Sequence, residues 1–151
     1  MKTLGFMLLV VSIVLLAAAL TAFRAQTGTT TITVVEHADT DAVADTGDEG
    51  DTVGDILTFA NPVYDEKNET QVGTDQGYCL RTEVGKSWEC NWTLLLDDGQ
   101  ITVEGPFFDA GDSVLSITGG TGEYANARGQ MTLHSRNEAG SEFDFIYEIA
   151  Q

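Results

Sequence analysis

The chain has 151 residues, enough for one domain rather than two, and its 24 acidic side chains against 7 Lys and Arg give a net charge of −17. Such a surface repels nucleic acid and anionic membranes, so we expect neither as a partner surface. Cys79 and Cys90 do not make metal-ligand spacing with His37 and His134. We therefore expect no metal, and we expect no cofactor.

Residues 1–26 have the pattern of a secretory signal peptide. Lys2 supplies a positive charge, the stretch from Leu4 to Ala22 is almost entirely apolar, and small residues follow Arg24. This pattern predicts export, with the protein secreted or extracytoplasmic. The apolar stretch is also long enough for an uncleaved N-terminal membrane anchor, which stays open as the alternative.

The first strand is predicted at Thr29–Glu36, where β-branched residues alternate. Ile32, Val34 and Glu36 fall on one face, so a carboxylate stands in line with apolar side chains. Residues 37–53 are rich in Asp, Gly and Thr and are expected to form an acidic loop, which is long for a connection without regular structure. Residues 27–53 thus hold the first strand and the acidic loop, and residues 54–151 hold the rest of the domain.

Seven further strands are predicted, each bounded by turn residues. They cover Asp55–Asn61, Val72–Val84, Trp88–Leu96, Gln100–Pro106, Asp112–Thr118, Ala127–Ser135 and Glu142–Ala150. Pro62 is expected to end regular pairing or to place its strand at a sheet edge, and Gly119–Gly122 is expected to form a turn.

Short turns and the lack of an amphipathic helical pattern indicate an all-β fold. Eight antiparallel strands can close into a β-barrel, which removes exposed sheet edges. We predict this eight-stranded antiparallel barrel, with a two-sheet sandwich as the alternative. A barrel of this size holds either packed side chains or one small ligand.

The two cysteines lie in one predicted hairpin around Gly85 and Lys86. Simple pairing across that turn puts Cys79 opposite about Thr93 rather than Cys90. A disulfide between Cys79 and Cys90 would therefore need a bulge or another register, and the pairing stays open on these grounds.

Several separate segments resemble, in order and spacing, the allene oxide cyclase and dirigent barrel superfamily, especially its bacterial allene-oxide-cyclase-like branch. The resemblance covers about residues 30–150. It rests on Gly54–Asn61 (GDILTFAN), Tyr64, Val72-Gly73, Gly77–Cys79 (GYC), Gly105–Phe107 (GPF), Asp112–Gly122 (DSVLSITGGTG) and Ala127–Gly129 (ARG). It implies an eight-stranded barrel, usually trimeric, with an elongated apolar pocket.

The superfamily guides ring closure or coupling by holding a reactive molecule in a dry cavity. By resemblance, Glu36 and Asn61 are the candidate catalytic residues, Glu36 to steer charge and Asn61 to help hold a bound water. The implied ligand-pocket walls are Leu57, Phe59, Cys79, Trp88 and Phe107. The match of Cys79 to a pocket cysteine favours a free thiol.

Two positions depart from the cyclase pattern. Ala38 stands where the cyclases have a second water-binding asparagine, and Ala44-Asp45 stands at the offset of their Ser-Pro pair. We therefore predict an exported barrel that binds a small hydrophobic molecule and guides its cyclisation or coupling, as an isomerase if it is catalytic and as a homotrimer by family analogy. The alternative is a non-catalytic secreted binding or surface protein that keeps the fold only.

Overall fold

The structure is a computed structural model that describes residues 28–150. The predicted signal peptide or anchor, residues 1–26, lies outside the described residues. Within residues 28–150, no helix is long and apolar enough to cross a membrane.

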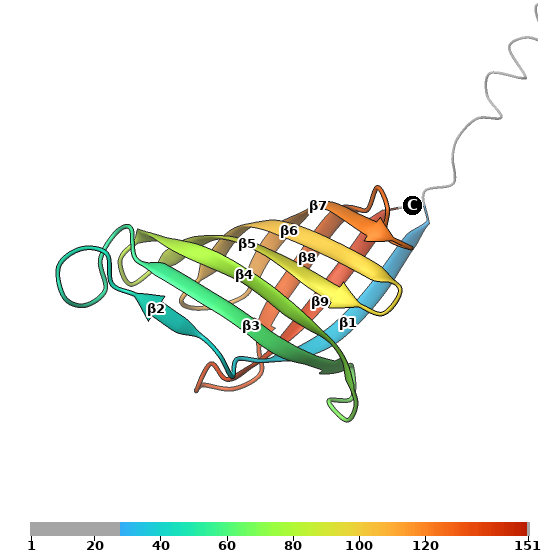
Figure 1. The fold of residues 1–151 in the computed structure, drawn as a ribbon, viewed down its shortest axis with the longest axis horizontal. Coiled ribbons are helices and arrows are strands. Elements are labelled where there is room, and N and C mark those ends of the chain that lie inside the picture. Colours follow the sequence, from blue (N-terminus) through green and yellow to red (C-terminus); the bar gives the residue numbers. More distant parts are fainter. Residues whose placement is uncertain (1–27, 151) are drawn as a thin grey trace, which may run out of the picture.

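Nine antiparallel strands make up the domain (Figure 1). They are β1 (Thr29–His37), β2 (Ala42–Ala44), β3 (Ile56–Asp65), β4 (Gln71–Glu83), β5 (Ser87–Leu96), β6 (Gly99–Phe108), β7 (Ser113–Gly122), β8 (Arg128–Ser135) and β9 (Glu142–Ala150). The eight predicted strands are all present. The three-residue β2 lies inside residues 37–53, so the expectation of a loop without regular structure was wrong at that point.

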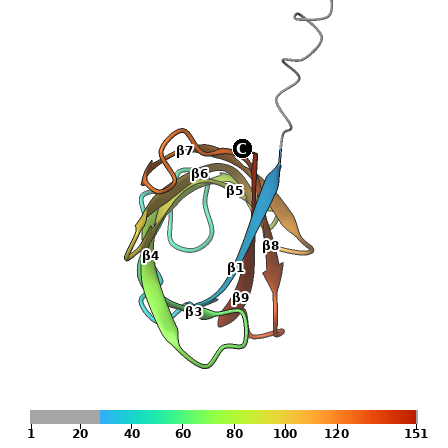
Figure 2. The same ribbon diagram turned by 90° about the vertical axis from the view of Figure 1, so that its right-hand side faces the viewer.

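The sheet closes on itself because β1 pairs with β9 along its whole length and also with the end of β3. The remaining strands pair in sequence order from β3 to β9. β2 pairs with residues 56–58 of β3, and β1 pairs with residues 63–65 of the same edge of β3. β1 and β2 therefore follow one another along β3 and together count as one strand of an eight-stranded barrel. Figure 2 looks along the barrel and shows the strands around its interior. The predicted barrel is confirmed, and the sandwich is excluded.

Alternation along the strands sends apolar side chains inward, and they fill the barrel unevenly. Leu94, Ile101, Met131 and Tyr147 are fully buried. One end of the barrel is where β3 and β9 begin and β6 and β8 end. There four apolar side chains are only partly buried: Leu57, Phe59, Phe107 and Phe143. We call this end the mouth. It is less tightly filled than the rest of the barrel interior.

Of the two expectations for Pro62, the strand end was wrong and the edge position is found, and the expected turn at Gly119–Gly122 was wrong. β3 continues through Pro62 to Asp65, because β2 pairs only with residues 56–58 and β1 only with residues 63–65, so the missing N–H of Pro62 falls where neither strand pairs. Gly119–Gly122 belongs to β7 rather than to a turn. A Cβ at Gly120 would lie 2.4 Å from the carbonyl oxygen of Tyr124, so this glycine permits a close backbone approach.

Cys79 and Cys90 form a disulfide, contrary to the free thiol implied by the resemblance. They are direct partners in the β4–β5 register, which shifts between Arg81 and Glu83. The bulge that a bridge would require is therefore present. Pairing counted from the turn without a bulge does not include this shift, and it therefore placed Cys79 opposite Thr93.

Loss of this disulfide is expected to lower the free energy of unfolding by roughly 2–3 kcal/mol, because the bridge closes a loop between residues 11 apart. Urea unfolding with and without a reductant measures the effect. The double variant Cys79→Ala/Cys90→Ala is the control, since its unfolding should not respond to the reductant. Equal unfolding midpoints for the oxidised and reduced wild type would contradict the expectation.

Candidate functional site

Two hollows meet at the mouth. An outer cleft of about 610 Å³ lies between the β6–β7 and β8–β9 connections. An inner pocket of about 40 Å³ lies within the barrel. Both are lined by Phe107, Leu133 and Phe143, so they adjoin there. The rings of Phe107 and Phe143 meet edge to face, with centroids 6.2 Å apart, and form the constriction between cleft and pocket.

The inner pocket combines an aromatic wall with a carboxyl group. Its wall includes Phe59, Trp92 and Phe145, with the Trp92 ring centroid 6.0 Å from that of Phe59 and 5.4 Å from that of Phe145. Glu36 also lines it and is only 5% exposed. Carboxyl groups are rarely this buried without a cation beside them, so Glu36 is a candidate functional group.

Asn61 holds Glu36 in place. Its amide nitrogen donates to Glu36 Oε1 at 2.6 Å and to Asp41 Oδ1 at 2.8 Å. Its amide oxygen accepts from the backbone N–H and the hydroxyl of Thr40, each at 2.9 Å. Because both ends of the amide are engaged, the donor end must face the two carboxyl groups.

Burial raises the pKa of Glu36 to about 7. The hydrogen bond from Asn61 opposes this rise, while the negative charges of Asp41 and Asp39 add to it. A group that titrates near neutral pH can both take and give a proton, so Glu36 is suited to general acid–base chemistry.

A second buried carboxyl group, Asp75, lies on β4 directly opposite Asn61. It is 0% exposed. Burial, and to a lesser extent the nearby charge of Glu36, raises the pKa of Asp75 to about 9. The site therefore contains two carboxyl groups of different acidity, of which Glu36 loses its proton first.

Sequence reasoning missed Asp75, Thr40 and Asp41. Asp75 could have been found, because it shares the alternating inward face of its strand with Cys79. Thr40 and Asp41 gave no such signal, since they belong to the acidic loop and reach Asn61 only through the fold.

Most of the pocket residues implied by the resemblance come together. Glu36, Leu57, Phe59, Cys79 and Phe107 line the inner pocket. Asn61 lies behind Glu36 as its hydrogen-bond partner. Trp88 does not line either hollow, and its ring instead lies under the guanidinium of Arg81, 3.9 Å from Cζ to the ring centroid.

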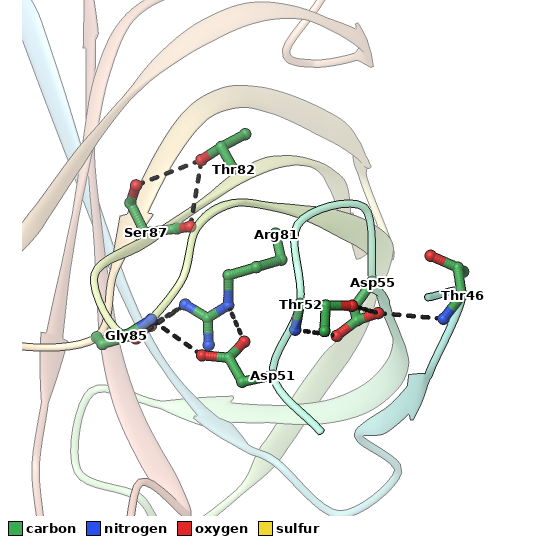
Figure 3. Close-up of polar contacts among 9 residues, drawn as sticks. Thr46, Asp51, Thr52, Asp55, Arg81, Thr82, Gly85 and Ser87 are labelled. Carbon is green, nitrogen blue, oxygen red and sulfur yellow. Dashed lines mark hydrogen bonds and ion pairs between the residues drawn. The ribbon is translucent and has the colours of Figure 1, made fainter. Parts of the chain in front are cut away.

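Arg81 ties the acidic loop to the mouth. Its Nε lies 2.6 Å from Asp51 Oδ1, and one terminal nitrogen lies 2.7 and 2.8 Å from the two carboxylate oxygens of Asp109. Figure 3 shows Asp51 reaching Arg81 and the backbone N–H of Gly85. Asp55 closes the loop on itself by accepting from the N–H groups of Thr46 and Thr52. The loop therefore has one anchor at Asn61 and a second at Arg81.

Nothing in the part of the chain that the structure describes forms a group of three or more His, Cys, Asp or Glu side chains able to hold a metal ion. Glu36 and Asp41 are the polar residues that line the inner pocket, and Asn61 and Asp75 lie next to them in the barrel interior.

Comparison with known proteins gives one family match and several solved structures with the same barrel. A family model described as allene oxide cyclase matches residues 32–137. A pyocyanin demethylase is 30% identical, with a TM-score of 0.68 over 78% of this chain and 100% of that one.

Two further solved structures share the fold at lower identity. A pterocarpan synthase dirigent protein is 16% identical, with a TM-score of 0.65 over 82% of this chain and 94% of its own. An exo-specific intermolecular Diels-Alderase is 14% identical, with a TM-score of 0.64 over 82% of this chain and 99% of its own.

The matched region begins within β1 and ends just after β8, and so takes in Glu36, Asn61 and Asp75. It spans well over half of the sequence, and the resemblance carried by the separate segments is confirmed. The chain belongs to the allene oxide cyclase family.

Proposed function

We propose that the barrel binds a small, largely apolar molecule at its mouth and guides its isomerisation or cyclisation, with Glu36 transferring a proton. One observation carries this proposal: the carboxyl group of Glu36 is buried in an aromatic pocket, and this burial raises its pKa to about 7. The body of the ligand lies in the outer cleft, and one end passes Phe107 and Phe143 to reach Glu36.

The related proteins support this type of function. The pyocyanin demethylase and the Diels-Alderase act on small molecules, as their names state, and the family model is that of a cyclase. The aromatic wall excludes water and holds the ligand, so positioning supplies part of the catalysis. Glu36 supplies the rest of the catalysis, because it accepts a proton from one position of the ligand and returns it to another.

The first experiment measures binding and then conversion. Pyocyanin serves as the first binding probe, because a pyocyanin demethylase is 30% identical to this chain. A polyunsaturated fatty-acid epoxide and a conjugated diene are then incubated with the protein and followed by liquid chromatography and mass spectrometry. Isomerisation or cyclisation gives a product of unchanged mass and changed retention time.

Glu36→Gln is expected to keep ligand binding within about threefold and to slow turnover roughly 10²- to 10⁴-fold, the usual contribution of a general acid or base. The amide keeps an oxygen to accept from Asn61, so the pocket keeps its shape. Glu104→Gln on the outer side of β6 is the matched control and should turn over like the wild type. Unchanged turnover in Glu36→Gln would rule out this role.

A non-catalytic binding protein is the second candidate. The inner pocket of about 40 Å³ favours it, because that space takes only water-sized groups while the constriction is closed. Ligands that bind and are recovered unchanged would support binding alone over catalysis.

We also propose that residues 1–26 direct export. The apolar N-terminal pattern supports this, and so does the Cys79–Cys90 disulfide, since disulfides persist in oxidising compartments. Cell fractionation followed by intact-mass measurement separates a cleaved from an anchored protein. Recovery of the full-length chain in the cytoplasm would contradict the proposal. Sedimentation of the same sample tests the homotrimer, which stays a prediction.

A further inference from the structure

Three polar side chains inside the barrel have no hydrogen bond of normal geometry. They are Asp75, with both of its carboxyl oxygens, the Trp92 indole N–H and the Tyr147 hydroxyl. None of the three residues is more than 2% exposed. Leaving a buried polar group without a partner costs about 1–3 kcal/mol, so three such groups in one barrel call for a functional explanation.

The three side chains belong to one region of the interior. Asp75 and Trp92 lie on the neighbouring strands β4 and β5, where the partners in the register are Asp75 with Leu94 and Gly77 with Trp92. Gly77 has no side chain to separate them. Tyr147 lies on β9 and interacts electrostatically with Asp75, and the Trp92 indole N–H is near enough to lower the pKa of the Tyr147 hydroxyl. Glu36 interacts electrostatically with Asp75 and with Tyr147.

Asp75 must be a neutral carboxylic acid in this environment. None of the ion pairs found within residues 28–150 includes it, and an isolated buried charge is far too costly to keep. The backbone amides of Asn61 and Asp75 oppose the rise in the pKa of Asp75 only in part. Burial also raises the pKa of Tyr147 well above its ordinary value, so its O–H stays protonated.

All three groups carry a hydrogen to donate: a carboxylic O–H, a phenolic O–H and an indole N–H, of which the indole N–H is directed at the Tyr147 hydroxyl oxygen. A carboxylic acid kept neutral by an apolar site can donate a hydrogen bond to an oxygen on which negative charge develops. Trp92 lines the inner pocket, and Tyr147 lies next to its indole nitrogen. Asp75 and Tyr147 do not line the inner pocket themselves and are fully buried, so these two donors lie behind its Trp92 wall.

We propose that Asp75, Tyr147 and Trp92 form an oxygen-binding subsite that takes the carbonyl oxygen of a ketone or enone whose body lies in the outer cleft. This inference rests on the proposed function and names its substrate class. The small volume of the inner pocket suits a single carbonyl end rather than a whole ligand.

The subsite and Glu36 together account for a balanced proton transfer. Glu36, as the carboxylate, takes a proton from the carbon next to the carbonyl group. The electron pair of that C–H bond forms a C=C bond, and the C=O π pair moves to the oxygen, which the three donors stabilise. When Glu36 returns the proton to a conjugated carbon, the C=O bond re-forms and the product is an isomer. When the proton returns to the same carbon, the ketone is re-formed. Neither outcome needs a co-reactant.

Two probes with one skeleton test the subsite: α-tetralone, which has a carbonyl group, and tetralin, which lacks it. Quenching of tryptophan fluorescence measures the binding of each to the full-length protein. We expect the wild type to bind tetralone about tenfold more tightly than tetralin, the usual value of one or two buried hydrogen bonds. In deuterated water the protein should also exchange the hydrogens next to the tetralone carbonyl.

Tyr147→Phe and Asp75→Leu are expected to bring the two affinities within about twofold of each other, and to slow the deuterium exchange. Phe107→Leu at the constriction is the matched control, since it should weaken both probes equally. An infrared band of a protonated carboxylic acid should disappear in Asp75→Asn and shift when tetralone binds to the wild type. This spectrum reports on Asp75 whether or not turnover is detected.

The outcomes separate the two proposals. Equal binding of tetralone and tetralin by the wild type overturns the oxygen subsite and leaves the apolar pocket intact. A tetralone preference that survives in both Tyr147→Phe and Asp75→Leu also overturns it. Binding of neither probe overturns the proposed function and the subsite together.

Discussion

Asp75→Asn is expected to make the protein more stable at neutral pH and to flatten the dependence of its stability on pH. Asparagine has nearly the same shape as the neutral carboxylic acid that occupies this buried position and cannot ionise. In the wild type, unfolding at pH 7 lets Asp75 release its proton to water, and this favours the unfolded state. Asparagine removes that advantage.

The direction follows from the raised pKa values of both buried carboxyl groups. A carboxyl group whose folded pKa lies above its unfolded value contributes stability that is fully present below the unfolded pKa and is lost as the pH rises through the folded pKa. Glu36 has a folded pKa of about 7 and Asp75 of about 9. Stability should therefore fall from about pH 4 to about pH 9, more steeply below pH 7, where both groups contribute.

Other carboxylates act in the opposite direction at low pH. Backbone hydrogen bonds lower the pKa values of Asp55 and Asp65, so the stability that these groups contribute is lost as the pH falls through their folded pKa values. The two trends together place the stability maximum near pH 4–5. A protein that is most stable in mild acid would be unusual, since most have their maximum between about pH 5 and 8.

The size of the Asp75 effect is on the order of 4 kcal/mol at pH 7, since one pKa unit corresponds to about 1.4 kcal/mol and pH 7 lies about three units above the unfolded pKa of an aspartate. Urea unfolding of wild type and Asp75→Asn between pH 4 and pH 9 measures it. Asp97→Asn at the exposed β5–β6 turn is the control for removing an aspartate. A variant with the wild-type slope and wild-type stability at pH 7 would show that Asp75 is not a buried neutral acid.

The fold was predictable because its determinants are local. β-branched and aromatic residues alternate along each strand, and short polar turns separate them, so the strands and their order follow from neighbouring residues. The Cys79–Cys90 pairing was not predictable in this way. It depends on a register shift between Arg81 and Glu83, which no local pattern reveals. Gly120 and Gly122 illustrate the same limit, because a Cβ at either position would collide with backbone carbonyl oxygens of other segments.

The candidate site likewise has residues that the sequence pattern predicts and residues that only the fold brings together. Glu36 stands in line with apolar residues of its strand, and this alternation alone distinguishes it from the many surface carboxylates of the chain. The partners that fix Glu36 and Asn61 come from the acidic loop and β4, and they meet only when the barrel closes. Asp75 could have been found in the same way as Glu36, because it too is a polar residue on the inward face of its strand.

Arg81→Met is expected to lower the free energy of unfolding by about 2–3 kcal/mol and to loosen the acidic loop. Methionine keeps much of the apolar contact with Trp88 but removes the cation that pairs with Asp51 and Asp109. Breaking a buried pair costs about 3–5 kcal/mol. The expected loss is smaller because the side chains of Asp51 and Asp109 are 38% and 29% exposed and water can solvate them.

Loss of the Arg81 cation is also expected to act locally, on the acidic loop. Residues 39–51 are all exposed, so polar contacts rather than apolar packing hold the loop (the anchors at Asn61 and Arg81). Segments with few buried apolar contacts open at low free-energy cost. Amide hydrogen exchange in residues 45–54 should therefore become faster in Arg81→Met, while exchange in β7 and β8 follows global stability alone.

Lys86→Met provides the matched control, because it removes a cation from the same β4–β5 hairpin. Lys86 pairs with Glu83, and both side chains are more than half exposed, so the expected loss is below about 0.5 kcal/mol. If Arg81→Met and Lys86→Met behave alike in unfolding and in loop exchange, Arg81 does not hold the loop. If only Arg81→Met loosens residues 45–54 and also speeds the binding of tetralin, the loop controls entry to the mouth, because Thr40 and Asp41 of the same loop are hydrogen-bonded to Asn61 beside Glu36.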